Sequence, residues 1–131
     1  VVVMNTPGGN AVSAAEHTIS LLLSLAKHIP QAAASMKAGR WEKGKFVSTE
    51  VSGKTLGLVG LGRIGGEVAK RARGLNMRVL VYDPYVSQER AEALGVELVE
   101  RADLFRQADF ISVHTPLTPE TTNLISSATM A

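Results

Sequence analysis

The fold of this chain is decided by the stretch TLGLVGLGRIG at residues 55–65. Its first half is mostly apolar and predicts a buried strand over residues 55–59, and a helix is predicted from Ile64 to Leu75. Between them, glycines stand at positions 60, 62 and 65, which is the G-x-G-x-x-G spacing of turns that bind dinucleotides. Glycine-rich turns are common, so this spacing is informative only because a strand precedes it and a helix follows it.

Each glycine has a separate physical role in such a turn. Gly60 allows the tight turn, Gly62 lets a diphosphate approach the backbone, and Gly65 lets the helix pack closely on the strand. The start of the helix then presents free N–H groups and the positive end of its dipole to the phosphates. Arg63 stands in this first turn, where a cation gains nothing from the helix dipole. We therefore expect its side chain to lie along the diphosphate and not in solvent.

A carboxylate follows the second predicted strand, residues 78–82. Asp83 comes 18 residues after Gly65, close to the roughly 20 expected for the acid that accepts hydrogen bonds from the adenosine ribose. A carboxylate repels a 2′-phosphate, and no Lys or Arg occupies the next three positions, so the predicted cofactor is NAD and not NADP. Taken alone, Asp83 is equally a turn residue before Pro84. Beside the glycine turn, the ribose role is favoured.

Strands and helices continue to alternate after the acid. The alternation predicts an α/β fold with a partial Rossmann-type parallel sheet of about four strands in the order 3-2-1-4. The elements predicted after Asp83 are a helix over 88–94, a strand over 97–99, a helix over 101–107 and a strand over 110–114. This order leaves the last strand at an open edge, which favours association of chains. His114, Thr115 and Pro116 fall at the carboxyl ends of the strands, where ligands gather, and we expect them to form a wall beside the adenosine half of the cofactor.

The first 53 residues have a different character. Residues 1–4 predict a short buried strand, and Ser13 and Glu16 have the capping-box spacing at the start of a long helix. The apolar side chains of this helix cover an arc of about 200°, roughly twice what one core-facing side needs. Either the helix is wedged inside one domain or it also packs on a partner subunit, and we favour a homo-oligomer through the helix Ala14–His28. A second helix is expected from about Pro30 to Ala38, followed by a loop.

Length and composition limit the remaining possibilities. The chain has 131 residues and a mass of 13.9 kDa, with 45% hydrophobic residues, 20% charged residues and no cysteine. These values predict one folded domain and exclude disorder. We expect a single truncated NAD-binding domain over 1–131, with a helical interface segment and loop over 1–53 and a βαβαβαβ half-Rossmann core over 54–131. The first residue, Val1, does not look like the start of a protein, and Ala131 stands in the middle of an alternation of apolar and polar residues. We therefore interpret the chain as a piece of a longer one.

Several partners and sites are not expected. The longest apolar run, residues 19–26, is well short of the roughly 20 residues that a membrane span needs, so no membrane partner is predicted. The absence of cysteine fits a reducing compartment and a cytoplasmic location. Eleven of the basic side chains precede Asp83, but such charge runs usually face solvent, so no nucleic-acid partner is predicted. No spacing typical of metal ligands and no Ser-His-Asp pattern occurs, so neither a metal site nor a catalytic residue is assigned.

These residues resemble the D-2-hydroxyacid dehydrogenase family along nearly the whole chain. The glycine turn and the His-Thr-Pro segment are similar to those of the family in general, whereas the opening Asn-Thr-Pro and the Gly-Arg-Trp segment resemble the branch that oxidises 3-phosphoglycerate. The segments that carry the resemblance are 5–10, 13–17, 39–41, 53–57, 60–65, 82–84 and 114–117.

The resemblance implies an enzyme that oxidises 3-phosphoglycerate to 3-phosphohydroxypyruvate with NAD in serine biosynthesis. It also implies that the family's substrate-binding Arg, its Glu and its catalytic His lie beyond the point matching Ala131, so that this chain alone is inactive. The alternatives are another family member, such as a glyoxylate or hydroxypyruvate reductase, or a non-catalytic NAD-sensing dimerisation module. The predicted cofactor-binding residues are Gly60, Gly62, Arg63, Ile64, Gly65, Asp83, Pro84, His114, Thr115 and Pro116.

Overall fold

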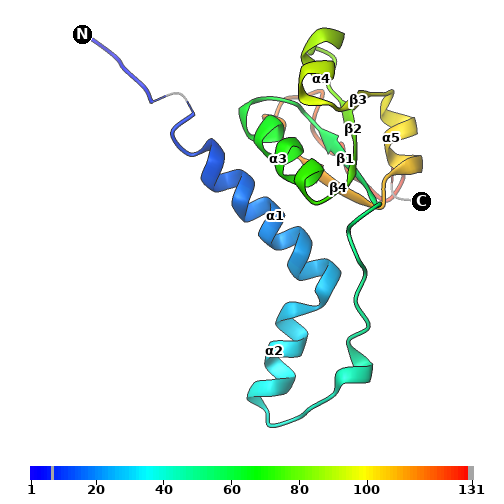
Figure 1. Ribbon diagram of the computed structural model, residues 1–131. Helices are drawn as coiled ribbons and strands as arrows, with labels where there is room; N and C mark the ends of the chain where they lie inside the picture. The colour runs from blue at the N-terminus through cyan, green and yellow to red at the C-terminus, as the bar shows by residue number, and fades with distance from the viewer. Residues whose placement is uncertain (7, 130–131) are drawn as a thin grey trace.

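A computed structural model describes residues 1–6 and 8–129 and places them in two regions, an arm and a sheet with its covering helices (Figure 1). The arm consists of α1 (Ala11–Lys27), α2 (Ile29–Lys37) and the short 3-10 turn η1 (Lys43–Lys45), after which the chain returns to the sheet. The remaining elements are β1 (Thr55–Val59), α3 (Arg63–Gly74), β2 (Arg78–Tyr82), α4 (Gln88–Leu94), β3 (Glu97–Leu98), α5 (Arg101–Gln107) and β4 (Phe110–Val113).

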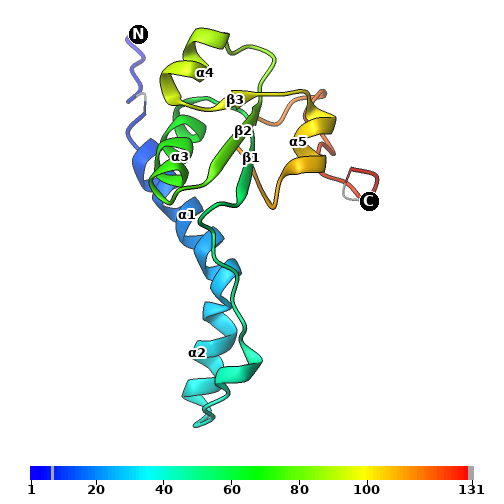
Figure 2. The ribbon, with the colours of Figure 1, turned by 45° about the vertical axis from the view of Figure 1, so that its right-hand side comes forward.

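The sheet is parallel, and within the described residues its four strands follow the order β3-β2-β1-β4, as the alternation of elements predicts. The central strand β1 pairs with β2 on one side and with β4 on the other, with Leu58 in register with Val81 and Ser112. Helices cover both faces, with α1 and α3 on one and α5 on the other (Figure 2). The predicted Rossmann-type fold is therefore confirmed.

Close packing of α5 explains a glycine inside β1. A Cβ atom at Gly57 would lie 2.6 Å from Cδ2 of Leu104 and 2.9 Å from Cβ of Ala108. Leu104 lies in α5 and Ala108 caps its end. The strand and the helix therefore approach each other so closely that no residue larger than glycine fits at position 57. The buried leucines of β1, Leu56 and Leu58, pack on the opposite face with α1 and α3.

Two predictions for the first residues are wrong. Residues 1–4 form no strand and are exposed, because no neighbouring strand in the described part of the chain pairs with them. The first helix begins at Ala11 with Asn10 as its N-cap, and no side chain caps it, so the Ser13–Glu16 capping box does not form. Glu16 instead lies 3.4 Å from Arg71 of α3 and joins the two helices. Pro7, in the predicted loop, lies outside the described residues.

The arm bends where the sequence predicts the end of the first helix, although one residue earlier. His28 adopts a left-handed conformation with φ 54°, which ends α1 and places Pro30 in the first turn of α2. Of the wide apolar arc of α1, one stripe packs on the sheet region, whereas Leu21 and Leu25 remain 58% and 68% exposed. The residues of α1 that are buried are Ala11, Ala15, Leu22 and Ala26.

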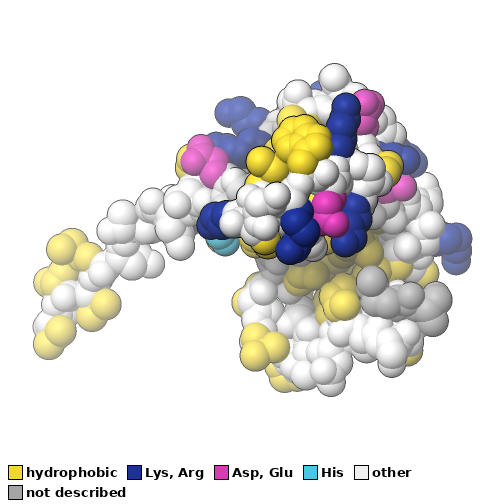
Figure 3. Space-filling view, turned by 90° about the horizontal axis from the view of Figure 1, so that it is seen from below, with side chains coloured by type: hydrophobic (Ala, Val, Ile, Leu, Met, Phe, Trp, Pro, Cys, Tyr) yellow, Lys and Arg dark blue, Asp and Glu magenta, His cyan; other side chains and the backbone are white. Residues whose placement is uncertain are grey.

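The far end of the arm combines an aromatic residue with basic ones. Trp41 is 77% exposed there, close in sequence to Lys37, Arg40 and Lys43. Figure 3 views this end of the molecule and shows Lys and Arg side chains around a small hydrophobic patch. Within the described residues, no helix is long and apolar enough to cross a membrane.

Candidate functional site

The glycine turn lies at the carboxyl edge of the sheet, between the end of β1 and the start of α3. Gly60 has φ +97°, a value that favours glycine, and its N–H donates to the carbonyl of Tyr82 at 2.9 Å. A Cβ atom on Gly60 would lie 2.6 Å from the backbone oxygen of His114. The end of β1 is therefore held between the ends of β2 and β4, and there is no room for a side chain.

Gly65 is required for a second close approach. A Cβ atom on this residue would collide with the carbonyl oxygen of Gly60, which belongs to the backbone and has no rotamer to adopt instead. The first turn of α3 therefore rests directly on the turn that precedes it. Gly60 and Gly65 are glycines because of contacts within the chain.

Gly62 differs from both. Its φ is −71°, an ordinary value, and apart from Gly62 itself and its chain neighbours Leu61 and Arg63, no atom of the described residues lies within 4 Å of the position its Cβ would take. Gly62 is also the N-cap of α3 and makes no side-chain cap bond, so the first N–H groups of the helix have no partner from the cap. The open space at Gly62, next to the first N–H groups of α3 and the positive end of the helix dipole, fits the diphosphate of a dinucleotide.

Asp83, directly after β2, is half-buried and reaches across to the turn. One carboxylate oxygen accepts a hydrogen bond from the N–H of Leu61 at 2.8 Å, and the other accepts from the N–H of Tyr85 at 2.9 Å. Each oxygen of a carboxylate has two acceptor sites, so both retain capacity for the hydroxyl groups of a ribose. Pro84 follows as an exposed residue.

Arg63 starts α3, but its side chain extends toward the beginning of the arm. Its Cδ lies 3.6 Å from the position of a Cβ on Gly8. The side chain lines a hollow of about 510 Å³ between α1, α3 and α4, together with Lys70 and Arg90. Ile64, the next residue of α3, is half-buried and packs against the core.

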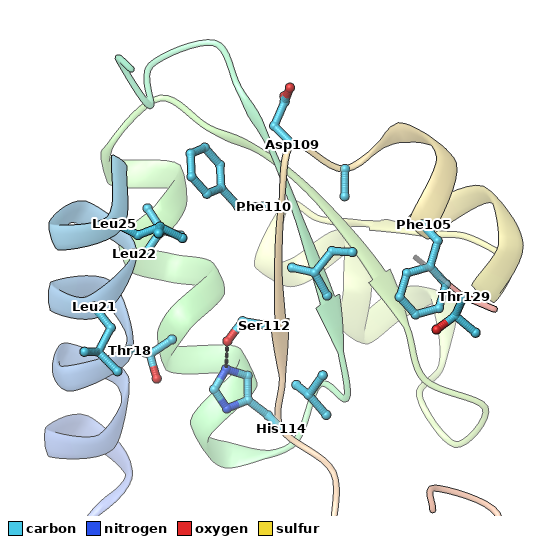
Figure 4. A pocket seen from close by; sticks show the side chains of 13 residues that line it. Thr18, Leu21, Leu22, Leu25, Phe105, Asp109, Phe110, Ser112, His114 and Thr129 are labelled. Atoms are coloured by element: carbon cyan, nitrogen blue, oxygen red, sulfur yellow. Dashed lines mark hydrogen bonds between the residues drawn. The ribbon is translucent and has the colours of Figure 1, made fainter. Parts of the chain in front are cut away.

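His114 contributes to the site in two ways (Figure 4). Its backbone oxygen borders Gly60, while its imidazole lies in a groove of about 660 Å³ between α1 and β4, with Nε2 2.9 Å from the hydroxyl oxygen of Ser112. Partial burial lowers the pKa of the His114 imidazole and favours its neutral form. Thr115 contacts the turn directly, since its Cγ2 lies 3.0 Å from a Cβ placed on Gly60, and Pro116 is exposed.

The structure thus brings the glycine turn, Asp83 and the segment 114–116 together at one edge of the sheet. Two neighbours of the site were not found from the sequence. Leu61 was overlooked because its contribution is a backbone N–H, which leaves no signal in side-chain chemistry. Ser112 could have been found, because alternation along β4 places it on the same face as His114. Among residues 1–6 and 8–129, no group of three His, Cys, Asp or Glu side chains is placed to hold a metal ion.

A family model described as D-isomer specific 2-hydroxyacid dehydrogenase, NAD binding domain, matches residues 19–131. The chain belongs to this family. The resemblance seen in the sequence is confirmed, and NAD is the cofactor of this 2-hydroxyacid dehydrogenase domain, as the glycine turn and Asp83 predict.

Relatives and solved structures agree with this assignment. The chain is 51% identical over 131 residues to the D-3-phosphoglycerate dehydrogenase of Synechocystis sp., covering 100% of this chain and 24% of the relative. It is 55% identical over 125 residues to the D-3-phosphoglycerate dehydrogenase of Archaeoglobus fulgidus, covering 95% of this chain and 24% of the relative. The NAD-dependent formate dehydrogenase from Staphylococcus aureus in complex with NAD is similar in structure, with a TM-score of 0.86 and 34% identity over 95% of this chain and 37% of that one.

This 2-hydroxyacid dehydrogenase domain therefore spans about a quarter of the length of the two phosphoglycerate dehydrogenases that it matches.

Proposed function

We propose that the turn at residues 60–65 and the carboxylate of Asp83 together bind NAD. The observation that carries this proposal is the open space at Gly62, where glycine is needed neither by the backbone nor by any neighbour in the chain. A cofactor phosphate placed there would receive hydrogen bonds from the first N–H groups of α3. The carboxylate of Asp83 would accept hydrogen bonds from the adenosine ribose, and it would repel the 2′-phosphate of NADP.

The other predicted residues frame this site. Gly60 and Gly65 shape the turn, and Arg63 and Ile64 begin the helix that carries the N–H groups. Once bound, NAD supplies the acceptor for a hydride. Pro84 lies beside the ribose-binding acid, and the backbone of His114 with Thr115 and Pro116 would limit the cofactor on the β4 side.

For the whole enzyme we propose oxidation of 3-phosphoglycerate to 3-phosphohydroxypyruvate, a step of serine biosynthesis. Support comes from the identity of 51% and 55% with two D-3-phosphoglycerate dehydrogenases over nearly all of the chain, which exceeds the 34% shared with the formate dehydrogenase. No residue described here is assigned to the proton transfer. We therefore expect the chain alone to produce no NADH from 3-phosphoglycerate and NAD, and measurable turnover by the pure chain would contradict this division of roles.

Calorimetric titration tests the cofactor site. NADH should bind the chain more tightly than NADPH, and Asp83→Ala should weaken NADH binding while reducing the discrimination between the two. Tyr85→Ala is the matched control, because this exposed residue contributes only its backbone N–H to Asp83. If NADPH binds to the unchanged chain as well as NADH does, the role of Asp83 is wrong.

We further propose that the chain forms a homo-oligomer through α1, in a cytoplasmic protein whose interface segment is 1–53 and whose cofactor-binding core is 54–131. Exposed Leu21 and Leu25 on α1 support the interface, because their apolar side chains face solvent beside the groove of β4. Light scattering should find a dimer or larger species for the unchanged chain and a shift toward monomer for the double variant Leu21→Gln, Leu25→Gln. A strictly monomeric chain at high concentration would contradict the interface.

A further inference from the structure

The anchoring of the glycine turn leads beyond the proposed cofactor contacts. The turn is attached to the sheet through the N–H of Gly60, which donates to Tyr82, and through the N–H of Leu61, which donates to Asp83. Leu61 is 1% exposed, so its N–H is removed from solvent and needs a partner inside the protein. In the part of the chain that the structure describes, the Asp83 carboxylate is the hydrogen-bond acceptor of this group.

We propose that Asp83 is a positioning residue for the diphosphate half of the site, in addition to its contact with the ribose. Its carboxylate bridges two backbone segments, the turn at Leu61 and the segment after β2 at Tyr85, with bonds of 2.8 Å and 2.9 Å. The N–H groups that bind phosphate follow Leu61 directly in the chain, so their direction depends on the position of this residue. One side chain therefore couples the two halves of the cofactor site.

This inference rests on the proposed function, because it assumes that the turn receives a diphosphate. It has a consequence that ribose recognition alone does not have. Removing the carboxylate weakens the binding of an anion that contains no ribose. The electrostatic effect of the same change is opposite in sign, since losing a negative charge near the site strengthens the binding of an anion.

Asp109 provides a matched control at the other end of β1. Its carboxylate accepts a hydrogen bond from the N–H of Thr55, the first residue of β1, at 2.8 Å. This bond resembles the one that Asp83 accepts from Leu61, just after the end of β1. Asp83→Ala and Asp109→Ala remove the same charge. An amide oxygen at position 83 could keep the bond to Leu61, whereas alanine accepts no hydrogen bond through its side chain.

The experiment titrates inorganic pyrophosphate into the unchanged chain and both variants and follows binding by phosphorus NMR. The unchanged chain and Asp109→Ala should bind alike, whereas Asp83→Ala should bind about fivefold more weakly, the effect of losing one buried hydrogen bond. In the absence of ligand, the amide of Gly60 should exchange its hydrogen faster in Asp83→Ala than in Asp109→Ala, because the turn is released. The Gly60 amide reports this without being bonded to either variant side chain.

The outcomes separate this inference from the proposed function. If the chain binds NADH but Asp83→Ala binds pyrophosphate as tightly as Asp109→Ala or more tightly, Asp83 contacts only the ribose and the positioning role is wrong. If the unchanged chain binds neither NADH nor pyrophosphate, the proposed cofactor site is wrong. In that case, hydrogen exchange of the Gly60 amide still tests whether Asp83 holds the turn. Equal exchange rates in the two variants would show that it does not.

Discussion

The turn region and the arm differ in what holds them in place. At the turn, Gly60 and Gly65 are enclosed by backbone atoms, and the Asp83 carboxylate holds Leu61. The arm beyond His28 is supported mainly by its own contacts, and of α2 only Ser35 is buried. The comparison indicates that the turn is held in place by the chain itself, whereas the arm leaves large apolar side chains such as Leu21, Leu25 and Trp41 exposed.

The sharpest way to break this comparison is Gly65→Ala. The added methyl group would collide with the carbonyl oxygen of Gly60, and neither backbone segment can move without disturbing β1. We expect a loss of about 3 kcal/mol or more in the free energy of unfolding, at the upper end of overpacking effects. Thermal unfolding followed by circular dichroism measures this. Gly74→Ala is the control, since nothing lies within 4 Å of that Cβ position.

Gly62→Ala should separate binding from folding within the same turn. Because the Cβ position is open and φ is ordinary, the midpoint of thermal unfolding should change little. The methyl group would occupy the space assigned to the diphosphate, so NADH affinity should fall by about tenfold or more, the equivalent of roughly 1.4 kcal/mol. Parallel calorimetric titration and thermal melts test this. Unchanged affinity would place the diphosphate elsewhere.

The arm offers a contrasting test at Ser35→Ala. The single proton of the Ser35 hydroxyl is shared between the carboxylate of Glu42 at 2.7 Å and the carbonyl of Arg40 at 3.1 Å, which ties α2 to the loop that carries Trp41. Losing these bonds should destabilise the end of the arm by about 1–2 kcal/mol. Hydrogen exchange should accelerate in residues 29–45 and stay unchanged in β1. Equal acceleration in β1 would show that the two regions unfold as one unit.

The smallest expected effect concerns pH and His114, which lies between the two regions. Burial lowers the pKa of this imidazole below its ordinary value of 6.5, so the folded state favours the neutral form. The contribution of His114 to the free energy of unfolding is therefore complete above about pH 6.5, and it is lost as the pH falls through the lowered pKa of the folded state. In His114→Gln, the decline of stability between about pH 7 and pH 5 should be shallower. An unchanged slope, from denaturant unfolding at each pH, would contradict this.

Most of the sheet region could be predicted from the sequence, and much of the start of the arm could not. The apolar periodicity of the strand and helix on either side of the turn and the spacing of its glycines are local patterns, and the structure retains them. The Ser13–Glu16 pattern predicted a cap by the same kind of reasoning, but Glu16 instead contacts Arg71 of α3. The difference arises because a contact with a residue 55 positions away is absent from any local pattern.

By itself, the sequence determined the parallel α/β architecture, the position of the glycine turn and the choice of Asp83 as its acidic partner. These follow from residue spacing, because apolar periodicity and the conformational freedom of glycine act over a few neighbouring residues. Only the tertiary structure decided which atoms enclose Gly60 and Gly65 and that Leu61 is held by Asp83. The enclosure of Gly60 by His114 and the bond from Leu61 to Asp83 depend on distances between segments 22 or more residues apart, and the contact of Gly65 with Gly60 depends on how the turn folds back on itself. The order of residues along the chain contains neither.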